Sequence, residues 1–216
     1  MEKNVCVMVL LASWLWLTVG GCATRMEDRR QPLSPAFGPT TGAASVRATP
    51  GVGVAVPLTA ENTRVTFIGT AGPSSHEGEF ERLQGEWTLP TDDAKESRLW
   101  VRVETGSLRT KIGLLTKHLT GKDFVDVEQF PTATFVSSRI EAVDGPGGAT
   151  HRVTGEFTIH GVNRAVTFPA RVVVTAKTAT LDGTFSISQT AFGMAAAAEK
   201  TKDEVPVTVS IRTARQ

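Results

Sequence analysis

The sequence has 216 residues, enough for one domain of ordinary size with appendages. Its 23 Lys and Arg residues nearly balance 22 Asp and Glu residues, and the formal net charge is +1. Nucleic-acid-binding proteins typically have a large basic excess, so this charge argues against that class of protein. Hydrophobic residues make up 40% of the chain, which is sufficient for a packed core. The chain has ten Phe, four Trp and no Tyr, so an aromatic pocket would offer no phenol group to a ligand.

The first 21 residues have the pattern of a bacterial export signal. A short start that carries Lys3 precedes an apolar run from Val5 to Val19, which is shorter than the roughly 20 residues of a membrane-spanning helix. The run ends at Val19-Gly20-Gly21-Cys22, which resembles the bacterial lipobox, in which small residues precede a cysteine that receives diacylglycerol. We therefore predict a lipoprotein signal peptide over residues 1–21 and lipid attachment at Cys22. The alternative is an ordinary signal peptide with a chance cysteine.

This signal predicts a location at the bacterial cell envelope, on the periplasmic side, with a lipid anchor. Ala23 follows the cysteine, which favours the outer membrane over the inner one. The only cysteines are Cys6 and Cys22, so we expect no disulfide in the mature domain. Its stability must then come from its core.

Residues 22–60 have the composition of a flexible tether. This segment holds five of the eleven prolines and one aromatic residue, Phe37, among many Gly, Ala, Ser and Thr residues. Such a segment buries too little apolar surface to offset the entropy of ordering it. We predict a tether between the lipidated cysteine and a domain that begins at residue 61; a small folded subdomain is the alternative.

From Glu61 onward apolar and polar residues alternate, which is typical of strands that are buried on one face. Turn-forming segments such as Pro90-Thr91-Asp92-Asp93 separate these stretches. The pattern predicts eight strands, at about 62–69, 77–89, 97–105, 133–142, 150–160, 164–176, 178–188 and 204–213.

One stretch between the third and fourth predicted strands has helical spacing instead. Leu108, Ile112, Leu115 and Leu119 would share one face of a helix over residues 108–119. We expect this helix to cover one end of an all-β, eight-stranded antiparallel barrel, whose interior is wide enough for side chains or one slim ligand.

Several segments in this region resemble one known family when they are taken together and in order. They are Ser75-His76-Glu77-Gly78, His118-Leu119 with the run Asp123 to Phe135, Val153 to Val162, and Gly183 to Met194 with Asp203-Glu204-Val205. They resemble the YceI-like family of polyisoprenoid-binding proteins, over residues 61–214. The chain departs from the family where Val125 replaces a usual Phe, and in the loop Ala195 to Ala198.

This resemblance implies a lipocalin-like barrel of eight strands with a helical segment near one end. Some members carry a long isoprenoid, such as a polyprenyl pyrophosphate or a quinone tail, in the lumen. The resemblance therefore implies binding, storage or transport of an isoprenoid or similar long-chain lipid. Because no catalytic motif such as Gly-x-Ser-x-Gly occurs, we predict no enzymatic activity and no cofactor besides that lipid. The balanced charge predicts no nucleic-acid partner.

The predicted ligand-binding residues are the apolar side chains of the inward strand faces, together with His118 near the helix. A lumen packed solid by the same side chains would instead make a structural envelope protein without a ligand. The residues are Phe67, Leu99, Val101, Val103, Phe135, Phe157, Ile159, Val166, Phe168, Phe185, Ile187 and His118.

Histidines are the only candidates for chemistry, and the alternative function is a metal-dependent enzyme that uses His76, His118 and His160. A metal site needs three or four converging ligands, and no close-spaced signature such as His-Glu-x-x-His occurs. We expect these histidines to make structural hydrogen bonds, and we predict neither a metal site nor catalytic residues.

Overall fold

The computed structural model describes residues 53–89, 97–194 and 202–214. All of these residues belong to one compact unit, Ser45–Gln216. The predicted signal peptide, the predicted lipid attachment at Cys22 and the predicted tether up to residue 52 lie outside the described residues. Within these three ranges, no helix is long and apolar enough to cross a membrane.

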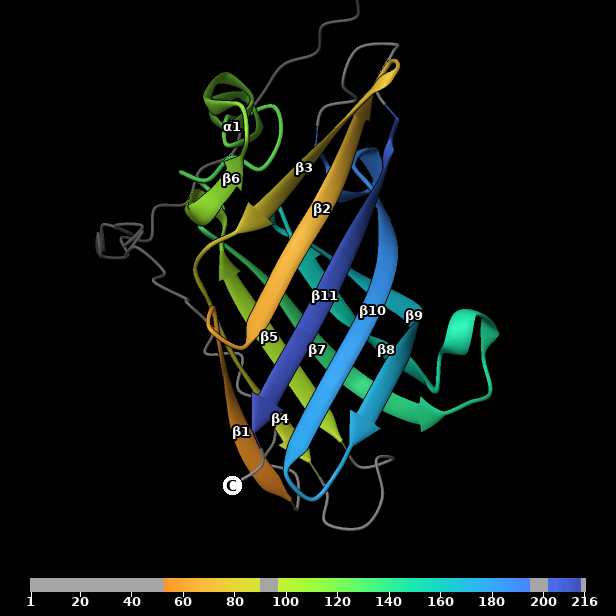
Figure 1. The fold of residues 1–216 in the computed structure, drawn as a ribbon. Helices are drawn as coiled ribbons and strands as arrows, with labels where there is room; N and C mark the ends of the chain where they lie inside the picture. The colour runs from red at the N-terminus through yellow and green to blue at the C-terminus, as the bar shows by residue number, and fades with distance from the viewer. Residues whose placement is uncertain (1–52, 90–96, 195–201, 215–216) are drawn as a thin grey trace, which may run out of the picture. The chain divides into compact units, whose positions relative to one another are not determined.

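The described residues form one strongly curled antiparallel sheet of eleven strands (Figure 1). The strands are β1 (Val54–Thr59), β2 (Thr63–Ala71), β3 (Ser74–Phe80), β4 (Leu83–Leu89), β5 (Arg98–Glu104), β6 (Leu108–Thr110), β7 (Thr132–Ala142), β8 (His151–Ile159), β9 (Val162–Val174), β10 (Thr178–Ser188) and β11 (Glu204–Ala214).

Hydrogen-bonded neighbours follow the order β1-β4-β5-β7-β8-β9-β10-β11-β2-β3-β6. The order does not close into a ring of hydrogen bonds, because β1 and β6 stand at its two ends. However, β3 and β4 are consecutive in the chain and are separated only by Glu81 and Arg82. This segment covalently joins β3 and β4, each of which lies next to one end of the order, so the sheet wraps around an interior.

The expected antiparallel sheet is confirmed, but the predicted number of eight strands is wrong. The first additional strand, β1, lies within the segment that we predicted to be a tether. Val56 and Leu58 alternate with polar or small residues and are buried in the core. Pro57 is tolerated because β1 is an edge strand, where a missing N–H breaks no ladder on the open side.

The second difference is a break in the predicted strand 77–89. The backbone N–H groups of Glu81 and Arg82 donate to the carbonyl and the hydroxyl oxygen of Ser107, at 3.2 and 3.0 Å. These residues therefore satisfy their donors outside the ladder, and one long strand becomes β3 and β4.

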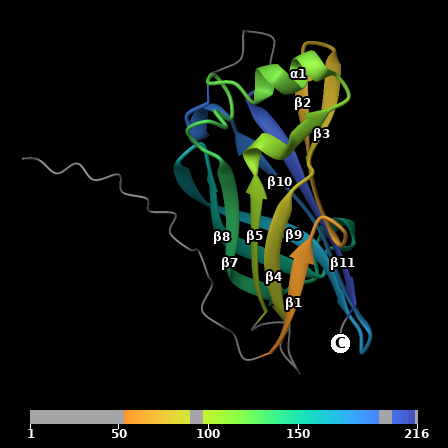
Figure 2. The same cartoon turned by 90° about the vertical axis from the view of Figure 1, so that its left-hand side faces the viewer.

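The third difference is at the predicted helix 108–119, of which only Gly113–Leu119 is helical, as α1. Leu108 to Thr110 instead form β6 and pair with Gly78 to Phe80. Ile112, which was expected on the buried face, is 47% exposed. Figure 2 shows α1 lying across one end of the curled sheet. The predicted position of the helix was wrong, because the helix begins at Gly113 and follows the additional strand β6.

Candidate functional site

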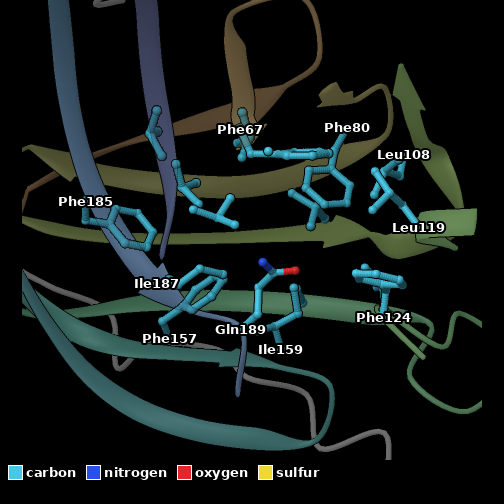
Figure 3. Close-up of a pocket in the computed structure, with 18 of the residues that line it drawn as sticks. Phe67, Phe80, Leu108, Leu119, Phe124, Phe157, Ile159, Phe185, Ile187 and Gln189 are labelled. Atoms are coloured by element: carbon cyan, nitrogen blue, oxygen red, sulfur yellow. The ribbon is translucent and has the colours of Figure 1, made fainter. Parts of the chain in front are cut away.

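The curled sheet surrounds a cavity of about 240 Å³ that is partly open to solvent. Side chains of most strands reach it, and α1 and the segment after it cover one end (Figure 3). The lining is Val65, Phe67, Gly69, Thr70, Ala71, His76, Phe80, Leu99, Val101, Val103, Leu108, Leu115, His118, Leu119, Phe124, Val125, Ala133, Thr134, Phe135, Phe157, Ile159, Phe168, Leu181, Phe185, Ile187, Gln189, Met194, Val205, Val207 and Val209.

The alternation of side chains along each strand places these lining residues on the inner face of the curled sheet. In β10, for example, Leu181, Phe185 and Ile187 are buried, while Thr184 and Ser186 between them are exposed. Successive side chains of a strand point to opposite faces, so one face of each strand contributes to the cavity wall. The wall is therefore a direct consequence of the alternation in the sequence.

Glycines make room for the aromatic rings along this wall. A Cβ on Gly78 would lie 2.2 Å from Cζ of Phe67, and one on Gly155 would lie 2.6 Å from Cζ of Phe135. Real Cβ atoms do not approach other atoms so closely, so these rings occupy the place of a side chain. The bulky side chains thus lie against the wall, and open space remains in the middle.

The end near α1 is closed by a second apolar cluster. Leu108, Phe124 and Val125 are buried together and pack against Phe67 and Phe80. His118 of α1 makes an edge contact with Phe124, with ring centroids 4.7 Å apart. This end of the cavity is therefore covered by side chains of α1 and the loop that follows it.

The lining has few polar side chains, and none of those that the structure describes has a carboxylate, ammonium or guanidinium group. The polar side chains are those of Thr70, His76, His118, Thr134 and Gln189. Of these only Gln189 is buried, with 8% exposure. Its Nε2 donates a hydrogen bond to the carbonyl of Lys202 at 3.1 Å.

The corner that carries Gln189 is held by a short helical turn, Thr190–Phe192, and by Asp203. The backbone N–H of Thr190 donates to Oδ1 of Asp203 at 2.8 Å, and the N–H of Gln189 donates to the carbonyl of Asp203 at 3.0 Å. Hydrogen bonds from the Ser188 hydroxyl and from the Thr190 N–H favour the ionised carboxylate and lower the pKa of Asp203. The carboxylate thus helps to fix this end of β10 next to the start of β11.

The structure places eleven of the twelve predicted ligand-binding residues, including His118, on the cavity wall. The exception is Val166, which is half-buried and packs against the core without lining the cavity. Its partner across the strands is Gly155, against which the ring of Phe135 lies. Phe135 therefore lines the cavity in this region in place of Val166.

The three histidines of the alternative metal site do not form one cluster. His76 and His118 line the cavity, whereas Nδ1 of His160 lies 3.2 Å from the carbonyl oxygen of Phe192 and its ring contacts Phe130. In the part of the chain that the structure describes, no group of three or more His, Cys, Asp or Glu side chains is placed to hold a metal ion.

Sequence reasoning missed several wall residues, above all Phe80, Phe124, Met194 and Gln189. Phe80 lies at the kink that ends β3, and Phe124 lies in the loop after α1. Neither place has the regular alternation that reveals buried residues. Gln189 could have been found, because it continues the inward series of β10 by one more step of two residues. Its polar side chain ended the apolar pattern and concealed its position.

The fold and the site define a curled antiparallel sheet that surrounds a partly open, almost wholly apolar cavity. The chain belongs to the YceI-like domain family, whose sequence profile matches residues 57–213. Among curated relatives, a UPF0312 protein of Pseudomonas putida (strain W619) is 37% identical over 103 residues, which cover 48% of this chain and 52% of the relative. The chain thus spans about half the length of the curated relatives it matches.

Solved structures share the fold. The crystal structure of Burkholderia cenocepacia BcnA is 26% identical, with a TM-score of 0.63, over 70% of this chain and 96% of that chain. A polyisoprenoid binding domain from Saccharophagus degradans is 14% identical, with a TM-score of 0.54, over 74% of this chain and 98% of that chain. The second likeness concerns the fold alone.

Proposed function

We propose that the protein binds a long-chain, isoprenoid-like lipid in the cavity and carries or stores it at the bacterial cell envelope. The observation that carries this proposal is the apolar cavity inside the curled sheet, whose lining holds no Asp, Glu, Lys or Arg side chain among the described residues. An apolar chain gains about 25 cal/mol for each Å² of apolar surface that leaves water. Binding of this kind requires no catalytic group, and the proposal includes no enzymatic step and no cofactor besides the lipid.

The size of the cavity favours a slender ligand. Its volume of about 240 Å³ lies slightly below the roughly 300–1,000 Å³ of pockets that enclose drug-sized molecules. A linear chain can enter such a space by its end. A long lipid would then be held along part of its length.

The comparisons support the choice of ligand class. The chain belongs to the YceI-like family, and one solved structure with this fold is described as a polyisoprenoid binding domain. The location rests on the sequence motif that ends at Cys22, from which we propose a lipid-anchored protein on the periplasmic side of the envelope, at the outer membrane.

Lipid extraction tests the proposal. The full-length protein, purified from the membranes of its own host in mild detergent, should release one predominant isoprenoid on extraction with organic solvent. Mass spectrometry should find about one such molecule per protein chain. Protein that carries only the bulk phospholipids of the membrane, in proportion to their abundance, would contradict the proposal.

A further inference from the structure

Gln189 occupies a position that the fold otherwise gives to apolar side chains. It follows Leu181, Phe185 and Ile187 on the inward face of β10. Ile187 pairs with Val205 of β11, and both side chains line the cavity next to it. An amide therefore stands on an apolar wall, as Figure 3 shows for its nitrogen and oxygen atoms.

The hydrogen bonds of Gln189 fix which end of the amide faces the cavity. The Lys202 carbonyl can only accept, so the group 3.1 Å from it must be the Nε2 of Gln189. Lys202 is itself held, because its N–H donates to the carbonyl of Thr70 at 3.0 Å. Oε1 is thus left as an acceptor, and it makes no hydrogen bond to any residue in the described ranges.

Oε1 is not among the fully buried, unpaired polar atoms of the described residues, so it borders space that a water-sized group can reach. A ligand that displaces water from this oxygen must supply a donor, because an unpaired buried acceptor is unfavourable. The cavity lining next to Gln189 offers it no cation. A ligand that supplies one neutral donor would satisfy the oxygen, whereas a plain hydrocarbon would leave it unpaired. The Nε2 group has a second N–H besides the one bonded to Lys202, so a hydroxyl group, which both donates and accepts, matches the free groups of the amide.

We propose that Gln189 receives the hydroxyl group of the ligand, so that the preferred ligand is a long-chain alcohol of the isoprenoid type. The hydroxyl donates to Oε1, and its hydrocarbon chain lies along the rings of Phe157 and Phe185, whose centroids are 5.5 Å apart. This inference rests on the proposed function and specifies the ligand class for the same cavity. Gln189 would select among lipids, while the apolar wall provides the affinity that is common to all of them.

A competition experiment tests the assignment. Delipidated full-length protein is incubated with an equimolar mixture of a C20 isoprenoid alcohol and the C20 hydrocarbon of the same branching. Free lipid is removed by gel filtration, and the ratio of the two bound lipids is measured by extraction and mass spectrometry. The same measurement is made on Gln189→Leu and on Ser186→Ala, which changes an exposed side chain on the outward face of β10 and leaves the cavity wall in place.

The ratio of alcohol to hydrocarbon should fall about tenfold from the unmodified protein to Gln189→Leu, since one hydrogen bond is lost. It should stay unchanged in Ser186→Ala. If Gln189→Leu does not fold, Gln189→Met provides a side chain of similar length that makes no such bond, and the same fall is expected.

An unchanged ratio in a folded Gln189 variant would overturn the proposal and leave the amide as a purely structural tie to Lys202. If the unmodified protein binds neither lipid, the proposed function itself fails, so the two failures are distinguishable.

Discussion

The ring of Phe168 lies against the bare Cα of Gly183. A Cβ on Gly183 would stand 2.6 Å from Cε2 of that ring, so the phenyl group occupies the place of the missing side chain. Phe168 also stacks on Phe185, with ring centroids 5.1 Å apart and an interplanar angle of 28°. Two aromatic rings are thereby held against one part of the cavity wall.

Gly183→Ala should destabilise the protein by about 1–3 kcal/mol, because the added methyl group must displace a packed ring. Thermal unfolding followed by circular dichroism measures the loss. Gly106→Ala is the matched control, since nothing lies within 4 Å of a Cβ at that position. Equal melting temperatures for the two variants would show that the contact between Phe168 and Gly183 does not contribute to stability.

Leu58→Ala should destabilise the protein by about 2–5 kcal/mol, because it leaves a cavity at a side chain that is 1% exposed. The exposed Glu61→Ala is the control and should melt like the unmodified protein. Denaturant unfolding provides the free energies. A Leu58 variant of unchanged stability would restore the interpretation of residues 54–59 as a tether.

The sequence predicted those strands best that have one buried and one exposed face over a long stretch. The alternation in β9 and β10 reflects burial directly, so these strands were located within two residues of their ends. β1 has the same alternation, but Pro57 and its place in a Pro-rich segment concealed it. Composition describes a whole segment, whereas pairing with β4 depends on a distant part of the chain.

The failures near the cavity end have a similar cause. Leu108 fits a helical face and a strand equally well, and its pairing with Phe80 decides between them. Ser107 interrupts the predicted strand 77–89, because it forms hydrogen bonds with Arg82, which is more than twenty residues away in the sequence. Gln189 was missed because a search for apolar stripes ends at the first polar residue, although the period continues.

Asp203→Asn should lower the melting temperature at neutral pH. The pKa of Asp203 lies below its ordinary value of 3.8 in the folded protein, so ionisation of this carboxyl favours the folded state. The contribution is present above pH 3.8 and is lost as the pH falls through the lowered pKa. The difference between the two proteins should therefore shrink with acidification. A difference that stays constant however far the pH is lowered would contradict the assignment.

Cys22→Ala should abolish lipidation and leave the signal segment uncleaved. The expected readout is a slower-migrating band on a gel and the loss of incorporated radiolabelled palmitate. Cys6→Ala, which removes the other cysteine, should be processed normally. Undiminished labelling of the Cys22 variant would show that the lipid is attached elsewhere, and an unlabelled unmodified protein would show that it carries no lipid.

The central claim is that the ligand lies inside the curled sheet, and a volume change tests it. Val101 lines the cavity and is 6% exposed, so Val101→Trp should fill the space that the lipid needs. The control is Val173→Trp, which makes the same replacement at an exposed position of β9. Val207→Phe provides a smaller obstruction from β11 should Val101→Trp not fold.

The decisive measurement is the amount of lipid extracted per folded chain from these variants, each purified alike and checked for an unchanged β-sheet circular dichroism spectrum. We predict that Val101→Trp or Val207→Phe retains less than about a tenth of the lipid of the unmodified protein, as expected when a ligand meets an overfilled interior. Val173→Trp should retain all of it. Full lipid occupancy in a folded, obstructed variant would contradict the account and place the ligand outside the sheet.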